Sequence, residues 1–469
     1  MNLIIKGRGL FLNNNEVLLD DLFTKEFFDY SNQEAGKYNN DTYGVNEIFL
    51  NIVQEKLALE RFVNDNIDLI DSIDIGEADI FLQFFSIDIA IKRDLKIINR
   101  PSLLKTKVII IFYIMQLGSF IKLMISMLKI PYSKDKPQVS DNFAVFRFSG
   151  QIPKTKRFVD IYKELESPFE KNTIYRYYTR PARVGWTVGA YLKSFRTIKK
   201  MKEVYRPVLG DTSVYSLSVF YQKRIVYAEL YTILLDHYFR FFRGKNYYMM
   251  NNLDRYSVIE DKTAHKYNIK TFNIPHGIEY GFKFPKGFAS DVFYTYADNT
   301  ATYLNKMYNT TKYVYRADVM EKLLSCDYEQ KESPRIVFFT EPREIYVNQR
   351  IIENILPIMK ERGLRLYLKL HGDKPSDYSD YDVTILANFA EAITGNICFA
   401  RKSTILLEAI YNHSVPIAII TNPKDNAMFE NFPSLNTDKI IKTFNENDLM
   451  EVVEKEYQNL KKQYDKKTC

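Results

Sequence analysis

The sequence contains little cysteine, glycine, proline or tryptophan. Its 469 residues include three Cys, 17 Gly, 16 Pro and one Trp. So little Gly and Pro excludes a collagen-like or low-complexity chain. The three cysteines have no CxxC spacing, which disfavours a disulfide scaffold and a zinc site. We therefore expect a protein of the reducing cytoplasm.

Composition and charge narrow the class further. Hydrophobic residues make up 46% of the chain and charged residues 26%, as in globular proteins. The formal net charge is +7, from 65 Lys and Arg against 58 Asp and Glu. This mild excess suits an anionic substrate or membrane surface better than a nucleic acid, which we do not expect as a partner. The N-terminus lacks the long apolar run of a signal peptide.

One apolar segment raises the question of a membrane. Val108–Ile121 comprises only 14 residues between Lys107 and Lys122, whereas a membrane-spanning helix needs about 20. Three interpretations stay open: a buried core helix, a helix lying at a membrane interface between flanking lysines, and a true span. The second would make the protein peripheral at the inner face of the plasma membrane. Its flanking lysines are Lys105, Lys107, Lys122 and Lys129.

Short apolar runs alternate with helix-like segments from residue 246 onward. We predict strands at 247–252, 270–277, 290–297, 335–342, 364–372, 382–388 and 415–421, and helices at 254–268, 348–363 and 401–414. This alternation is typical of doubly wound parallel α/β sheets. The charged stretch 320–335 is predicted to be a hinge. We expect two Rossmann-like domains facing a cleft, residues 1–325 with helical additions around 186–245, and residues 326–469.

Ligands of such folds bind beyond the carboxyl ends of the strands, and the first candidates are histidines there. His276 follows one predicted strand and is placed to act as a general base, or only to hydrogen-bond its turn. Lys369 and His371 end another strand, where they would neutralise a phosphate or merely lie in a charged surface turn.

The third candidate is the start of a helix. Ser403 and Thr404 follow Arg401 and Lys402 and precede a helical segment that contains Glu408. Ser and Thr are good helix N-caps, and a helix N-terminus binds phosphate through its N–H groups and dipole. The alternative is an ordinary capped helix. We expect no metal ligands here, and we interpret the acidic stretch 377–382 as a solvated loop.

Four motifs follow one another along residues 245–430. They are MNNLDRYSVIED…AHKYNIKTFNIPHG…ASDVFYTYA (249–297), FFTEP (338–342), KLHG (369–372) and STILLEA (403–409), followed by Val415-Pro416. With these motifs the segment resembles the GT-B glycosyltransferases that build bacterial surface polysaccharides. The similarity is to polysialyltransferase-like and lipooligosaccharide sialyltransferase-like enzymes, and more distantly to CDP-glycerol glycerophosphotransferases.

The resemblance implies residue roles. A His-Pro motif and a Ser/Thr motif bind the donor phosphate in these enzymes, and the roles fall here on His371, Ser403 and Thr404, although Gly372 replaces the proline. Lys369 would assist them, Glu341 would lie near the donor, and Glu408 would brace the turn or touch the ribose. The resemblance places the acceptor on the N-terminal domain.

These expectations combine into one predicted function. The protein would be a metal-independent glycosyltransferase without a cofactor. It would move a sugar, sialic acid or a relative in the narrowest version, from a nucleotide-sugar donor to a capsule, lipooligosaccharide or other glycan or glycolipid acceptor. A polyol-phosphate transferase on the same fold and a non-catalytic polysaccharide-assembly protein are the alternatives.

Overall fold

The computed structural model describes residues 1–13, 15–37, 47–134, 140–145, 158, 160–164, 169–172, 174–241, 244–250, 255–274, 277–279, 281, 287–329, 333–341, 345–371 and 374–468. The chain forms two compact units. Unit 1 comprises Met1–His276, Phe282–Tyr294 and Met307–Val314, and unit 2 comprises Gly277–Gly281, Thr295–Lys306 and Tyr315–Cys469. Unit 2 thus takes two short segments from the middle of the chain. The division into residues 1–325 and 326–469 stays a prediction.

A small mixed sheet opens unit 1, and the sequence patterns did not indicate it as a separate layer. Its strands are β1 (Asn2–Gly7), β2 (Gly9–Leu12), β3 (Asn15–Leu18), β4 (Ser72–Ala78) and β5 (Lys96–Ile98), in the order β3-β2-β1-β4-β5. The first three strands pair antiparallel, and β4 and β5 join in parallel. The helices of this region are α1 (Lys25–Lys37), α2 (Glu47–Asp65) and α3 (Ile80–Arg93).

The second sheet of unit 1 is of the doubly wound type. It comprises β6 (Asn142–Val145), β7 (Phe169–Asn172), β8 (Asn246–Met249), β9 (Lys270–Asn273), β10 (Val292–Thr295) and β11 (Tyr313–Tyr315). Their order is β11-β10-β9-β8-β6-β7, so the order reverses beside β6, as in flavodoxin-like folds. The pairs β6–β7, β6–β8, β8–β9 and β9–β10 are parallel. The predicted strands at 247–252, 270–277 and 290–297 are confirmed.

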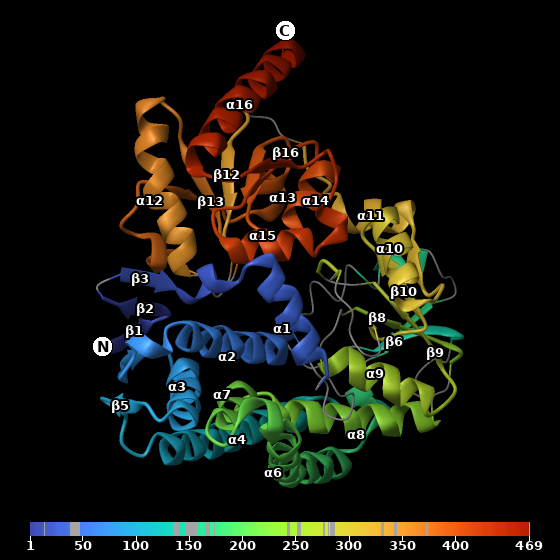
Figure 1. The fold of residues 1–469 in the computed structure, drawn as a ribbon. Coiled ribbons are helices and arrows are strands. Elements are labelled where there is room, and N and C mark those ends of the chain that lie inside the picture. The colour runs from blue at the N-terminus through green and yellow to red at the C-terminus, as the bar shows by residue number, and fades with distance from the viewer. Residues whose placement is uncertain are drawn as a thin grey trace. The chain divides into compact units, whose positions relative to one another are not determined.

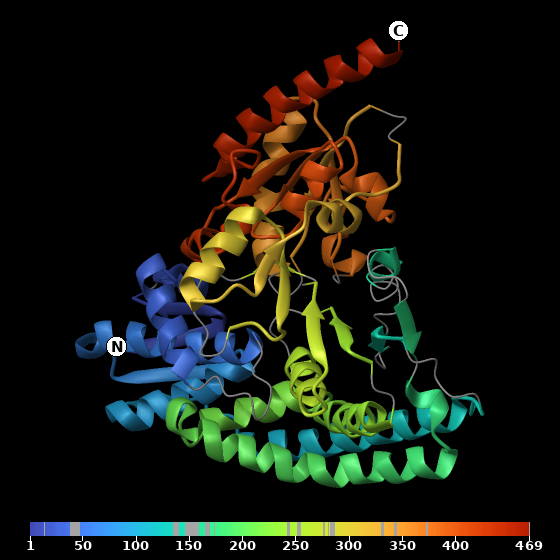
Figure 2. The ribbon, with the colours of Figure 1, turned by 90° about the vertical axis from the view of Figure 1, so that its right-hand side faces the viewer.

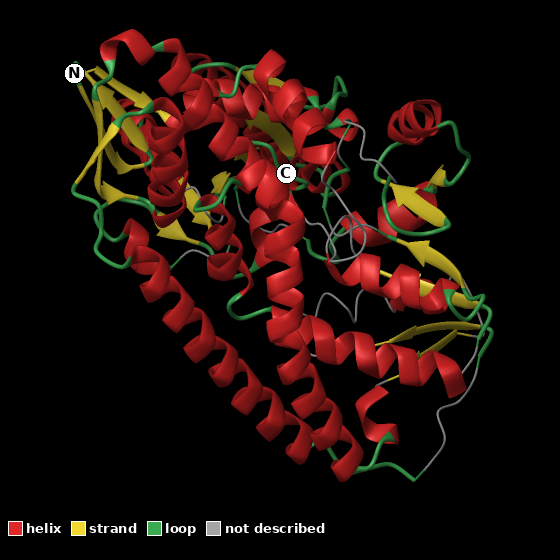
Figure 3. Ribbon diagram, turned by 60° about the horizontal axis from the view of Figure 1, so that its bottom comes forward, coloured by secondary structure: helices red, strands yellow, loops and turns green. Residues whose placement is uncertain are grey.

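A layer of long helices completes unit 1. It comprises α4 (Leu104–Lys129), α6 (Arg180–Leu209), α7 (Ser216–Tyr221) and α8 (Ile225–Phe241), and α9 (Arg255–His265) packs beside α8. The first four pack against one another (Figure 1), and Figure 3 brings the layer forward. Buried apolar residues recur along them at helical spacing, for example Ala190, Ile198 and Met201 of α6. The helices predicted within 186–245 are therefore confirmed.

Unit 2 is built on a fully parallel sheet. Its strands are β12 (Ile336–Phe339), β13 (Leu366–Lys369), β14 (Thr384–Ile385), β15 (Ile397–Ala400), β16 (Val415–Ile419) and β17 (Ile441–Thr443), in the order β14-β13-β12-β15-β16-β17. All five pairs are parallel. Numbered along the chain, this is the 3-2-1-4-5-6 order of a Rossmann fold. The predicted fold class, two Rossmann-like α/β domains, is confirmed.

Helices surround the unit 2 sheet (Figures 1 and 2). They are α12 (Ile345–Glu361), α13 (Phe389–Ile393), α14 (Ile405–Tyr411), α15 (Pro423–Glu430) and α16 (Glu446–Thr468). Unit 2 also contains most of α10 (Asp298–Tyr308) and all of α11 (Ala317–Leu324), which packs on α14. In the core, the rings of Phe338 and Phe399 stack with centroids 4.9 Å apart. The predicted start of the hinge at residue 320 is wrong, because α11 continues to Leu324.

Candidate functional site

The carboxyl ends of three neighbouring strands of unit 2 lie at one edge of the sheet. Phe338 of β12 pairs with Phe399 of β15, and Phe339 pairs with Lys369 of β13, so the three strands end nearly level. After β12 the chain forms β13 and β14 on one side of that strand, and it then crosses to form β15 on the other side. The ends of β12 and β15 therefore form the switch point at which Rossmann folds bind ligands.

Glu341 lies in the turn after β12, at this switch point. It is half-buried, and a buried asparagine of α12 fixes its backbone. The Glu341 N–H donates to Asn348 Oδ1 at 3.3 Å, and Asn348 Nδ2 donates to the Glu341 carbonyl at 2.9 Å. Asn348 also donates to the hydroxyl of Tyr378. Asn348 therefore positions this turn, and no motif in the sequence marks it.

Lys369 and His371 end β13 but differ in what they contact. The Lys369 ammonium donates to the carbonyl oxygens of Leu386 and Ala387 at 3.2 and 2.7 Å, and partial burial lowers its pKa. Lys369 thus holds the end of β14 to β13. His371 is exposed, and its backbone N–H donates to Thr340 Oγ1 at 3.1 Å. Its imidazole therefore lies at the carboxyl edge of the sheet.

The turn after β15 carries an ion-pair cluster that the sequence did not reveal. Arg401 binds Asp425 with two hydrogen bonds of 2.5 and 2.8 Å, and both side chains are 1% exposed. Lys402 pairs with the same carboxylate, which also accepts from Asn422 Nδ2 at 3.0 Å. The two cations that precede Ser403 and Thr404 are therefore partly neutralised by Asp425.

Ser403 and Thr404 lie between this cluster and α14. Thr404 is the N-cap residue, but its side chain makes no capping hydrogen bond. Ser403 Oγ accepts a long bond of 3.4 Å from the N–H of Ile405. Thr404 thus occupies the N-cap position without a side-chain cap, which leaves its hydroxyl uncommitted to the helix. Glu408 is half-buried in the first turn of α14.

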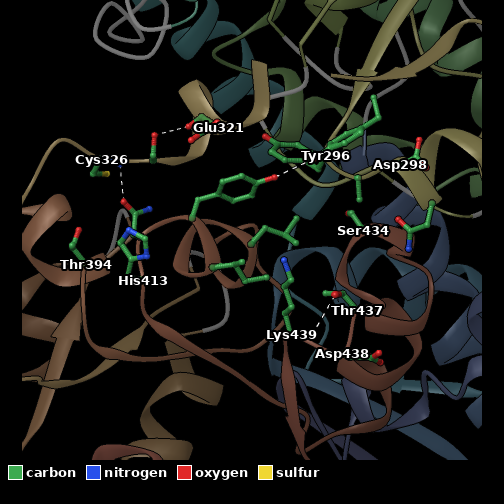
Figure 4. A pocket seen from close by; sticks show the side chains of 18 of the residues that line it. Tyr296, Asp298, Glu321, Cys326, Thr394, His413, Ser434, Thr437, Asp438 and Lys439 are labelled. Carbon is green, nitrogen blue, oxygen red and sulfur yellow. Dashed lines mark hydrogen bonds between the residues drawn. The ribbon is translucent and has the colours of Figure 1, made fainter. Parts of the chain in front are cut away.

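A separate cavity of about 990 Å³ lies within unit 2 (Figure 4). Thr394, His413 and Lys439 line it just before β15, β16 and β17, so it opens toward the amino ends of these strands. None of the predicted donor-binding residues lines it. Its lining is acidic, which suits a phosphate poorly; the carboxylates are Asp298, Glu321, Asp327, Glu329 and Asp438.

Glu279 is a buried carboxyl that the sequence analysis missed. It is wholly buried, and its oxygens accept from the Tyr296 N–H at 2.5 Å and from Ser434 Oγ at 3.2 Å. Burial raises its pKa to about 7, against an ordinary value of 4.5, although these hydrogen bonds oppose the shift. Its partners Tyr296 and Ser434 line the cavity. The only sequence signal was its place three residues after His276.

We expect Glu279 to make stability depend on pH. Between about pH 4.5 and 7 the Glu279 carboxyl stays protonated in the folded chain but is ionised in the unfolded chain. The free energy of unfolding therefore falls as the pH rises through this window. Relative to wild type, Glu279→Gln should gain about 3 kcal/mol between pH 4.5 and 7. Urea unfolding at both pH values measures this, with the exposed Glu361→Gln as control. Parallel pH profiles for wild type and Glu279→Gln would contradict it.

His276 lies outside the described residues, so its role as a general base stays a prediction. Within the described ranges, no group of three or more His, Cys, Asp or Glu is placed to hold a metal ion.

Comparison with known proteins gives remote structural similarity. The sequence matches no family model and no curated protein. Among solved structures, S. aureus MnaA with UDP is similar over 68% of this chain and 96% of its own (10% identity, TM-score 0.39). The UDP-GlcNAc 2-epimerase of Methanocaldococcus jannaschii is similar over 66% and 91% (9%, 0.41), and the Streptomyces nogalater glycosyltransferase SnogD over 69% and 94% (9%, 0.35).

Proposed function

We propose that unit 2 binds the nucleotide part of an activated sugar at the switch point of its sheet. One observation carries this proposal. Glu341 and the Ser403–Thr404 turn follow the two strands between which the strand order reverses, and His371 ends the adjacent strand. Doubly wound sheets bind their ligands in this position.

The side chains at this edge supply suitable chemistry for a phosphate leaving group. The hydroxyls of Ser403 and Thr404 and the imidazole of His371 would donate hydrogen bonds to its oxygens. Donors aimed at developing charge stabilise a transition state without needing a metal. Glu341 and Glu408 would accept from ribose hydroxyls. Lys369 contributes mainly by holding β14, because its ammonium already binds two carbonyls.

On this basis we propose a cytoplasmic glycosyltransferase. Unit 1 would hold the acceptor, a glycan or glycolipid of the bacterial surface, and His276 would deprotonate its hydroxyl. Transfer of sialic acid or a related sugar to capsule or lipooligosaccharide is the narrowest form, and the sequence resemblance supports it. A polyol-phosphate transferase would use the same phosphate site, whereas an assembly protein would bind no nucleotide.

The first test removes the two hydroxyls. We expect Ser403→Ala combined with Thr404→Ala to weaken donor binding at least tenfold, because hydrogen bonds to a charged group contribute about 1.5–3 kcal/mol each. Stability should change little, since Thr404 makes no capping bond. Binding of CMP-, CDP-, UDP- and GDP-activated donors, measured by calorimetry and thermal shift, identifies the nucleotide.

A matched control removes two hydroxyls from the acidic cavity instead. Thr394→Ala with Thr437→Ala should leave donor affinity unchanged, because both residues line the opposite end of the sheet. If this control loses affinity and the Ser403–Thr404 variant keeps it, the donor binds in the cavity and the proposed site is wrong. Conversion of the donor sugar without any acceptor would contradict transfer while leaving the site intact.

A further inference from the structure

Helix α4 exposes a continuous apolar stripe. Ile110, Ile114, Leu117, Ile121 and Ile125 recur every three or four residues and are each between 46% and 61% exposed. The opposite face packs against α6, α7 and α8. The interpretation of this segment as a fully buried core helix is therefore wrong. A stripe of this length on the surface marks an interaction site.

Helix α4 is apolar on both faces, and two of its polar side chains point inward. Gln116 is buried among the apolar residues of the inner face, and its Nε2 donates to the carbonyls of Tyr221 and Gln222 at 3.2 and 3.0 Å. Ser119 also faces inward and is 8% exposed. A helix that faces water has its polar residues outside and its apolar residues inside. These inward bonds fix the rotation of α4 that turns its isoleucines outward.

An aromatic seam joins α4 to α6 beside this stripe. Phe120 stacks on Tyr191 with ring centroids 4.6 Å apart, and Tyr113 meets Phe195 at 5.5 Å. Tyr113 is 51% exposed and Leu192, next in sequence to Tyr191, is 60% exposed. The apolar surface therefore continues from α4 onto α6, and the two helices pack against each other.

The charge of these two helices is strongly positive. Helix α4 carries four lysines and no acidic residue, and α6 carries eight Lys and Arg against the single Glu203. The whole chain has a net charge of only +7, so the rest of the protein is net acidic. Exposed lysines flank the stripe at Lys107, Lys122 and Lys129. Basic residues around an apolar helical face are typical of helices that bind anionic membrane surfaces.

We propose that the α4–α6 face binds an anionic lipid bilayer, with α4 lying in the plane of the interface. The isoleucine stripe would enter the headgroup boundary, and the flanking lysines would contact lipid phosphates. A second copy of this chain fits this face less well. A symmetric interface would bring the same basic helices together, and like charges repel.

The packing of α4 favours a peripheral helix over a spanning one. Among the described residues, α4 is the one helix long and apolar enough to cross a membrane by length and composition. If α4 crossed the membrane, Gln116 and Ser119 would lose their hydrogen bonds to the carbonyls of residues 221–223, and Lys122 would be buried in lipid. Each unsatisfied polar group in hydrocarbon is costly. The proposal does not depend on the proposed donor site in unit 2.

Vesicle sedimentation of the full chain tests the proposal. We expect binding to phosphatidylcholine vesicles that contain phosphatidylglycerol, and much weaker binding to phosphatidylcholine alone or in high salt. Ile114→Ser with Leu117→Ser should weaken binding at least tenfold, because both side chains lose their insertion energy. Lys107→Gln and Lys122→Gln should each weaken it about fivefold, the effect of one lysine near an anionic surface.

The matched control removes two equally exposed apolar side chains elsewhere. Leu69→Ser with Phe444→Ser should bind vesicles as wild type does; these side chains are 42% and 58% exposed. Equal binding by this control and the Ile114–Leu117 variant would overturn the proposal. Failure of wild type to bind the anionic vesicles would overturn it too. If wild type is then a dimer and the Ile114–Leu117 variant a monomer, a second copy of the chain covers this face. Donor affinity of that variant should be unchanged, which separates this test from that of the proposed function.

Discussion

Asp425→Ala is expected to destabilise unit 2 by about 3–5 kcal/mol, the usual cost of removing one partner from a buried ion pair. The carboxylate accepts from Arg401, Lys402 and Asn422. Without Asp425, a guanidinium that is 1% exposed would keep its charge in the core. Urea unfolding measures the loss, and hydrogen exchange should place it in β15 and α15.

Two further variants make this prediction specific. The exposed Asp380→Ala should change stability by less than about 0.5 kcal/mol. Arg401→Met combined with Asp425→Leu should recover much of the loss, because apolar replacements of a buried pair are often tolerated. If Asp425→Ala is as stable as Asp380→Ala, the pair contributes nothing, and another contact must hold β15 to α15.

His276→Ala should lower turnover by about two to four orders of magnitude, the scale for loss of a general base, with donor affinity nearly unchanged. The two histidines lie in different units of the chain. His276 follows β9 of unit 1, where we place the acceptor, whereas His371 follows β13 of unit 2, where we place the donor. His371→Ala should therefore raise the donor Kd and leave the chemical step less affected.

Single-turnover rates and donor Kd values for both histidine variants decide the assignment. The exposed His413→Ala is the matched control, because it removes an imidazole from the opposite end of the unit 2 sheet. We expect it to behave as wild type in both measurements. If His276→Ala loses donor binding and His371→Ala loses only turnover, the two roles are reversed.

Much of the unit 2 sheet could be predicted from sequence, but β15, one of its two central strands, could not. The runs at 335–342, 364–372 and 415–421 are long and bounded by polar turns, and they contain β12, β13 and β16. β15 is only Ile-Cys-Phe-Ala, and a run of four apolar residues cannot be told from part of a buried helix by its pattern alone. β15 is identified by its pairing with β12 and β16, and this pairing exists only in the folded chain.

The candidate site shows the same division. Because a strand was predicted at 364–372, the sequence could predict that His371 follows a strand end, but not that Ser403 follows β15, for which no strand was predicted. It could not predict that Arg401 and Lys402 share Asp425, which lies 24 and 23 residues further along the chain. Nor could it predict that Glu279 would be buried against Ser434. Such pairings depend on which helices pack beside which strands.

The bond between Ser434 and Glu279 also bears on the order in which the protein can fold during synthesis. Ser434 follows Glu279 by 155 residues. At a translation rate of about 5–20 residues per second, Glu279 leaves the ribosome some 8–30 s before its partner. Unit 1 can complete most of its structure in that time, whereas the segments Gly277–Gly281 and Thr295–Lys306 must wait for the rest of unit 2. A fragment that begins after these segments would therefore fold without part of its own core.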